Sequence, residues 1–309
     1  AVSRGASPGL RVVSPRKART VRSFMRLGLA QLNTTVGDLA GNRARILDAY
    51  RTLVARGAEL VVFPELVVCG YPPRDLLFKR RFVPDVAESL AAIAREIGDI
   101  PALIGTVEAN LAGRGRPFFN AAAFCHRGAV SATGRKCLLP TYDVFDEDRY
   151  FEPASENAVI HWEGRRLGLT ICEDIWNDDD FGVQSRYRPD PAAALVASGA
   201  EILINLSASP WQLGKERRRC DLLRSLARRH QVPVVYCNLV GGNDELVFDG
   251  RSLAFNAEGG CIAEAAHFAP DFLVVDTESA GDRPLRAVAD EALLHDALVL
   301  GTLLLHVVI

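Results

Sequence analysis

Residues 167–176 read LGLTICEDIW, an apolar run that ends in a cysteine followed by two acids. Short apolar runs bounded by polar residues are typical of buried strands. In α/β sheets, binding and reacting groups gather where such strands end. Cys172 is an unusual packing residue at this point, because two carboxylates follow it directly. For the other six cysteines, a buried and inert role is expected.

The same pattern of apolar runs recurs along the chain and alternates with longer helical patterns. Strands are predicted at 27–31, 60–63, 102–107, 120–126, 167–172, 202–206, 234–239, 252–256 and 272–275. Helices are predicted at 42–56, 84–97, 188–198 and 214–230. This alternation predicts one α/β domain, with helices outside and apolar strands inside.

Two further strand ends carry polar residues that could do chemistry. In VVFPE, residues 61–65, Glu65 follows an apolar strand directly, so we expect partial desolvation and a raised pKa suited to moving protons. In RKCLLP, residues 135–140, Lys136 ends a strand before a long polar stretch. A solvated glutamate at a strand end and a solvent-facing lysine are the alternatives at these two positions.

Together, Glu65, Lys136 and Cys172 resemble the Glu-Lys-Cys pattern of the nitrilase superfamily. The surrounding segments resemble one branch, the glutaminase domain of glutamine-dependent NAD synthetase. They are AQLNTTVGDLAGN, VVFPELVVCGYPPRDLL, KCLLPTYDVFDEDRYFEP, LTICEDIW, INLSASPW and CNLVGGNDELVFDGRS. The resemblance implies a four-layer αββα sandwich that commonly assembles into homo-oligomers by symmetric packing of one sandwich on another.

The resemblance also implies roles in amide cleavage. Cys172 would be the nucleophile, and the nearby lysine cation would favour its thiolate. Glu65 would take the thiol proton, pass it to departing ammonia and then activate water. Lys136 would stabilise the oxyanion, together with the backbone N–H of Glu173. Glu147 resembles the second glutamate of the superfamily, which orients the lysine.

A second set of residues is implied for recognition of glutamine. Glu173 resembles the residue that binds the α-amino group, with Tyr142 contributing a hydroxyl. Ser209 and Lys215 align with residues that hold the amino-acid head group, although Lys215 could equally be a solvated helix residue. Phe145 and Trp176 are candidates for pocket walls, and core packing is their alternative.

Composition narrows the class of protein further. With 36 Lys and Arg against 38 Asp and Glu, there is no net field that would favour nucleic acid or an acidic membrane. Seven scattered cysteines without a CxxC pair argue against a disulfide framework and for a reducing, cytoplasmic setting. The isolated histidines predict no metal site. The apolar segment 297–309 is too short for a membrane span.

The two ends of the sequence differ from the segment between them. Residues 1–24 are basic and acid-free, which predicts a disordered tail or, alternatively, an organelle transit peptide. The hydrolase domain is expected over 25–285, and residues 286–309 are expected to begin a linker helix. No SGGxxS or GxxxxGK[ST] loop occurs, so ATP and Mg would belong to a synthetase partner or domain outside this sequence.

Two other interpretations of the sequence remain open beside a glutaminase. The chain could be a free-standing hydrolase of another small amide. It could also be a non-catalytic subunit of a synthetase, although Glu65, Lys136 and Cys172 are all present.

Overall fold

The computed structural model describes residues 25–176 and 190–305. One six-stranded sheet has the order β14-β1-β2-β3-β4-β5. Its strands are β1 (Arg26–Gln31), β2 (Leu60–Val62), β3 (Ala102–Ala109), β4 (Phe118–His126), β5 (Ala129–Arg135) and β14 (Asp271–Asp276). The pairs β1·β2 and β2·β3 are parallel, so the carboxyl ends of these strands lie at one edge of the sheet.

A second six-stranded sheet has the order β13-β12-β9-β8-β7-β6. Its strands are β6 (Val159–Trp162), β7 (Arg165–Ile171), β8 (Ile202–Ser207), β9 (Val234–Asn238), β12 (Leu253–Phe255) and β13 (Cys261–Glu264). The central strands β7, β8 and β9 are parallel. A separate hairpin joins β10 (Val240–Asn243) to β11 (Leu246–Asp249).

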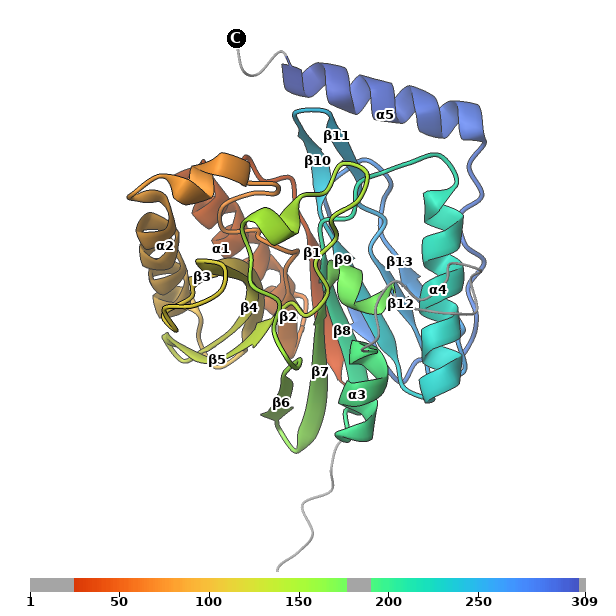
Figure 1. The fold of residues 1–309 in the computed structure, drawn as a ribbon. Coiled ribbons are helices and arrows are strands. Elements are labelled where there is room, and N and C mark those ends of the chain that lie inside the picture. Colours follow the sequence, from red (N-terminus) through yellow and green to blue (C-terminus); the bar gives the residue numbers. More distant parts are fainter. Residues whose placement is uncertain (1–24, 177–189, 306–309) are drawn as a thin grey trace, which may run out of the picture.

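Helices cover the outer face of each sheet (Figure 1). The helices α1 (Leu39–Ala55) and α2 (Phe82–Glu96) lie against the first sheet, and α3 (Pro191–Ala197) and α4 (Lys215–His230) lie against the second. Short 3₁₀ turns form at η1 (Arg74–Phe78), η2 (Glu147–Arg149) and η3 (Cys172–Ile175). The layers therefore follow the order helix, sheet, sheet, helix, which confirms the predicted αββα sandwich.

The alternation of side chains along β8 shows how a mainly apolar strand serves two layers. Ile202, Ile204 and Leu206 belong to the core between the two sheets, whereas Leu203 belongs to the core beneath α3 and α4. Successive side chains of a strand point to opposite faces, so a strand buried on both faces carries apolar residues at most of its positions. The continuous apolar runs in the sequence have this cause.

Every predicted strand and helix has a counterpart in the described residues, with small shifts at the ends. Positions 188 and 189 of one predicted helix, and the basic tail 1–24, lie outside the described residues. The sequence analysis missed β5, β6, β10, β11 and β13 as elements. The reason is clearest for β5, AVSATGR, which is mostly exposed and therefore has no apolar run.

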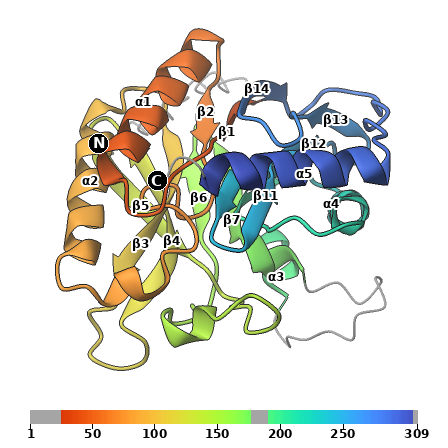
Figure 2. The same cartoon turned by 90° about the horizontal axis from the view of Figure 1, so that it is seen from above.

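A further helix, α5 (Asp290–Leu305), crosses the β10–β11 hairpin outside the sandwich (Figures 1 and 2). Leu293 and Ala297 are buried, whereas Leu294, Leu298 and Val299 are exposed. The helix occupies the segment where a linker helix was expected. Over residues 25–176 and 190–305, no helix combines the length and apolar character needed to cross a membrane.

Candidate active site

Glu65 lies just beyond the carboxyl end of β2 and is fully buried. Its backbone N–H faces the carbonyl of Ser207 at 3.4 Å, so the residue sits where the first sheet meets the second. Its Oε1 accepts hydrogen bonds from Lys136 Nζ at 2.8 Å and Asn120 Nδ2 at 2.7 Å. Its Oε2 accepts one from the backbone N–H of Ala208 at 2.9 Å.

Lys136 follows β5 directly, and its side chain is completely buried. Besides Glu65, its Nζ contacts both oxygens of Glu147, at 2.9 and 2.8 Å. The Tyr71 hydroxyl donates a further hydrogen bond to Glu147 Oε1 at 2.8 Å. The lysine is therefore held between two carboxylates, and the solvent-facing alternatives for Glu65 and Lys136 are wrong.

The charges in this cluster are unequal, because two carboxylates share one cation. Burial acts to lower the pKa of Lys136, but Glu147 and Glu65 outweigh it, so the pKa lies well above its usual value. Burial raises the pKa of Glu147 despite the opposing effect of Lys136, and the charge on Glu65 adds to the rise. Lys136 therefore stays charged, and burial favours the protonated form of Glu147.

Cys172 begins η3 at the end of β7, with φ of 43°. Asp174 holds this turn, because its carboxylate accepts the backbone N–H of Ile171 at 2.9 Å and those of Cys137 and Leu138 at 3.0 and 2.8 Å. One carboxylate thus joins the cysteine turn to the segment that carries Lys136. A positive φ in a non-glycine residue is a strained conformation, and such positions cluster at functional sites.

The pKa of the Cys172 thiol lies above its ordinary value, although Lys136 acts to lower it, as expected. Burial and the negative charge of Glu65 raise its pKa, and Lys136 opposes them without prevailing. Burial is the largest cause, and Glu147 and Glu173 add to it because they disfavour a further negative charge. A thiol in this environment holds its proton more tightly than a free cysteine does.

The structure brings most of the predicted recognition residues together near Cys172. Tyr142 donates a hydrogen bond to Glu173 Oε1 at 2.8 Å and packs edge-on against Phe145, with ring centroids 5.6 Å apart. Lys215 Nζ lies 5.9 Å from the ring centroid of Phe145 and 5.6 Å from that of Trp176. It also donates to the Pro210 carbonyl at 3.0 Å.

Lys215 is not the solvated helix residue that its position at the start of α4 would allow. Burial lowers its pKa to about 8, and the nearby charge of Arg219 acts in the same direction. Ser209, next to the carbonyl that Lys215 contacts, is buried, and its backbone N–H donates to Asn238 Oδ1 at 3.0 Å. The site thus offers a cation, Lys215, and a carboxylate, Glu173, whose charges both interact with the thiol.

Three residues in contact with the site were not identified from the sequence. Tyr71 binds Glu147, Asn120 binds Glu65, and Asp174 holds the cysteine turn. Tyr71 and Asp174 lie within the segments VVCGYPPRDLL and LTICEDIW. Asn120 is the one polar residue in the middle of FFNAAAF, and a buried amide inside an apolar strand is a signal in its own right.

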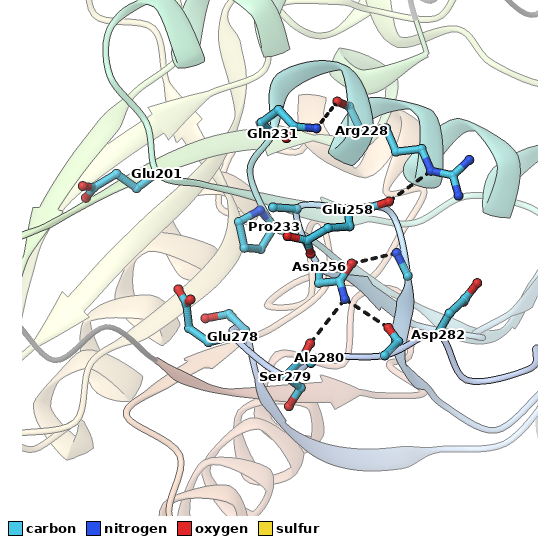
Figure 3. A pocket seen from close by; sticks show the side chains of 14 residues that line it. Glu201, Arg228, Gln231, Pro233, Asn256, Glu258, Glu278, Ser279, Ala280 and Asp282 are labelled. Atoms are coloured by element: carbon cyan, nitrogen blue, oxygen red, sulfur yellow. Dashed lines mark hydrogen bonds between the residues drawn. The ribbon is translucent and has the colours of Figure 1, made fainter.

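A cavity of about 480 Å³ adjoins the Glu147 side of the cluster. Tyr71, Phe145 and Glu147 line it, together with Glu245 and Leu246 from the β10–β11 hairpin. Another cavity, of about 710 Å³, lies beneath the end of α4 and shares no residue with the cluster (Figure 3). Four acids and Arg228 line this second cavity, and its buried Asn256 is fully engaged with backbone groups.

Relatives of known activity resemble the chain over most of its length. Glutamine-dependent NAD(+) synthetases of Synechocystis sp. and Thermotoga maritima are 41% and 39% identical over 89% and 82% of this chain. The chain covers 51% and 42% of those two proteins, so it spans about half their length.

Solved structures resemble the fold as well. A glutamine-dependent NAD+ synthetase from Acinetobacter baumannii, in complex with ADP, has a TM-score of 0.81 and 28% identity, covering 91% of this chain and 51% of that one. A mutant of the Nesterenkonia AN1 amidase, from the nitrilase superfamily, has a TM-score of 0.68 and 27% identity. The match covers 82% of this chain and 90% of the amidase chain. The carbon-nitrogen hydrolase family model matches residues 26–286. With a buried thiol, two carboxylates and a lysine at its centre, the chain belongs to the carbon-nitrogen hydrolase family.

Proposed function

We propose that this chain hydrolyses the side-chain amide of glutamine through a thioester on Cys172 and releases ammonia. The observation that carries the proposal is the contact of Lys136 with both Glu65 and Glu147 beside a buried thiol. The opposite charges of Glu173 and Lys215 next to that thiol add the means to recognise an amino acid. An inert subunit would have no need of these buried charges, which are costly to keep.

In the first half of the reaction, the Cys172 S–H proton passes to Glu65 as the sulfur attacks the amide carbon. The carbonyl oxygen becomes an oxyanion, and the charge of Lys136 and the N–H of Glu173 stabilise it. Glu65 then gives the same proton to the amide nitrogen. The carbon–nitrogen bond breaks, ammonia leaves, and the acyl group remains on sulfur as a thioester.

In the second half, Glu65 takes a proton from water while the water oxygen attacks the thioester carbon. The carbon–sulfur bond breaks, glutamate leaves, and the proton returns from Glu65 to the Cys172 sulfur. Transfers of this kind typically contribute about 10² to 10⁴ in rate. Glu147 takes no proton in either half, and its role is to orient Lys136 with the help of Tyr71.

Recognition of the amino-acid head group is proposed for Glu173, Lys215 and the residues that contact them. Glu173, held by Tyr142, binds the α-ammonium group, and Lys215 binds the α-carboxylate next to Ser209. Phe145 and Trp176 flank Lys215 and form apolar walls. Their low polarity strengthens the charge pairing between Lys215 and a carboxylate.

The proposal is tested by release of ammonia and glutamate from glutamine, measured beside acetamide and propionamide. We expect kcat/KM for glutamine to exceed that for the short amides, and Lys215→Met to remove that preference while leaving the short amides unaffected. Equal rates on all three substrates, unchanged in Lys215→Met, would contradict recognition of glutamine. Absence of turnover on every amide would contradict the hydrolase itself.

A free-standing amidase is the second candidate, because the chain also shares its fold with the Nesterenkonia AN1 amidase, at a TM-score of 0.68 and 27% identity. The first candidate adds a partner: ammonia would pass to a synthetase, which would hold the ATP and Mg. Glutamine hydrolysis measured with and without a separately supplied synthetase separates the two candidates, because only a coupled glutaminase should be stimulated.

A further inference from the structure

We propose that Asn120 is a positioning residue that assigns different tasks to the two oxygens of Glu65. By this inference, Oε1 stays hydrogen-bonded throughout the reaction, and Oε2 carries the proton between sulfur, nitrogen and water. The inference rests on the proposed role of Glu65 as the base. It concerns which oxygen acts and what holds it, and it applies to any substrate of this site.

Asn120 lies in β4 and is 1% exposed. Its Nδ2 donates to Glu65 Oε1 at 2.7 Å, and an ionised carboxylate only accepts hydrogen bonds, so the amide nitrogen has to face it. The backbone carbonyl of Asn120 accepts the N–H of Lys136 at 2.9 Å. This single strand residue therefore fixes both the base and the backbone of the cation.

Counting the hydrogen bonds of Glu65 shows why its oxygens differ. Each carboxylate oxygen offers two lone-pair positions. Oε1 has two donors, from Asn120 and Lys136. Oε2 has one donor in the described part of the chain, the N–H of Ala208. One acceptor position therefore remains on Oε2, and it is the place where a proton can arrive without displacing a protein donor.

Stability gives no reason for an amide at this position. The Oδ1 atom of Asn120 is buried and has no hydrogen-bond partner among residues 25–176 and 190–305. An unpaired buried acceptor is costly, and a leucine of similar size would avoid that cost on an apolar strand. The other bond of the side chain, to Glu65, is the one that a leucine would lose.

Two substitutions and one control test the inference. Asn120→Leu should lower kcat/KM by about 10- to 100-fold, because a hydrogen bond to a charged group is lost. In the plot of kcat/KM against pH for this variant, the fall in activity toward low pH should begin about one pH unit higher, because the Glu65 anion is less well stabilised. Asn120→Asp can donate only when protonated, so its activity should recover toward low pH and fall as pH rises. If the substitutions only disturbed packing, neither the shift in Asn120→Leu nor the recovery at low pH in Asn120→Asp would be seen.

Asn256→Leu is the matched control, because Asn256 is also a buried amide with several hydrogen bonds but lines the distant cavity (Figure 3). It should lower the melting temperature and leave the pH profile in place. Asn120→Ala replaces Asn120→Leu if the larger side chain prevents folding. Profiles in both Asn120 variants that match the parent in shape would overturn the inference.

Alkylation of Cys172 by iodoacetamide gives a readout that does not depend on glutamine. The rate of alkylation against pH should shift in the Asn120 variants as the kcat/KM profile does. If glutamine is not hydrolysed but the alkylation profile shifts, the proposed substrate fails and the role of Asn120 stands. If glutamine is hydrolysed and neither profile shifts, the role of Asn120 fails alone.

Discussion

Burial and the charge of Glu65 raise the pKa of the Cys172 thiol, in a cluster that holds more carboxylates than cations. In the proposed mechanism, attack on a carbonyl is therefore coupled to proton transfer, unlike in sites where a preformed thiolate waits beside a cation. Cys172→Ala should abolish amide hydrolysis and leave thermal unfolding nearly unchanged, because only one sulfur atom is lost from the core. Turnover comparable to that of the parent would remove the cysteine from the mechanism.

In the proposed mechanism Lys136 has a catalytic role, and in the structure it neutralises two buried carboxylates. Lys136→Met keeps the aliphatic stem and should lower kcat by about 10² to 10³, the usual cost of one oxyanion-stabilising group. It should also destabilise the fold by about 3 to 5 kcal/mol, because Glu65 and Glu147 lose their cation. A variant with unchanged kcat and raised KM would move Lys136 from transition-state stabilisation to substrate binding.

Lys215 should make the activity of the site depend on pH in alkaline solution. Burial lowers its pKa to about 8, so the ammonium is present below pH 8 and is lost as pH rises through that value. If Lys215 holds the α-carboxylate, kcat/KM for glutamine should fall about tenfold for each pH unit above pH 8. The reason is that the pH dependence of kcat/KM follows the ionisation of groups in the free enzyme. Lys215→Arg remains charged and should remove this limb. The same decline in both proteins would assign it to another group.

The sequence was sufficient to predict the strand ends at which the proposed reacting groups lie. Glu65 and Cys172 follow continuous apolar runs, and the structure places both at carboxyl ends of parallel strands. Asn120 and Asp174 escaped prediction because their roles depend on partners distant in sequence, such as the contact of Asp174 with Leu138. The exposed strand β5 was missed because it has no apolar pattern, although Lys136 follows it.

Helix α4 depends on a buried ion pair at its inner face. Arg219 is fully buried and binds Asp249 of β11 through two hydrogen bonds of 3.0 Å. Arg219→Met should destabilise the protein by about 3 to 5 kcal/mol, because Asp249 would be left as an unpaired buried charge. Arg217→Met, on the same helix, breaks an exposed pair with Asp290 and should cost at most about 1 kcal/mol. Equal effects in urea unfolding would contradict this distinction.

The site exists only where the two sheets meet, and this is the feature that no single segment of sequence could predict. Glu65 and Lys136 come from the first sheet, and Cys172 comes from the second. The N–H of Ala208, just after β8, reaches across to Glu65 Oε2. A chain that formed one sheet alone would have every predicted residue and no site, so the family resemblance was needed to connect them.

Helix α5 lies outside the four layers and can be separated from them. It crosses the β10–β11 hairpin and buries Leu293 and Ala297, and the family match ends at residue 286 (Figure 2). A chain ending at residue 286 should therefore keep cooperative unfolding and lose only a few degrees of melting temperature, because burying one leucine and one alanine contributes about 2 to 3 kcal/mol.

Activity provides the second readout for the same truncation. The hairpin lines the cavity beside Glu147 through Glu245 and Leu246, and Arg74 holds Asp244 and Glu245 from the opposite side. These ion pairs remain when α5 is removed, so KM and kcat for glutamine should change by less than about threefold. Leu293→Asp in the full chain should give the same small change, because it releases the helix without shortening the protein. A large rise in KM in both proteins, with unfolding still cooperative, would show that α5 sets the position of the hairpin.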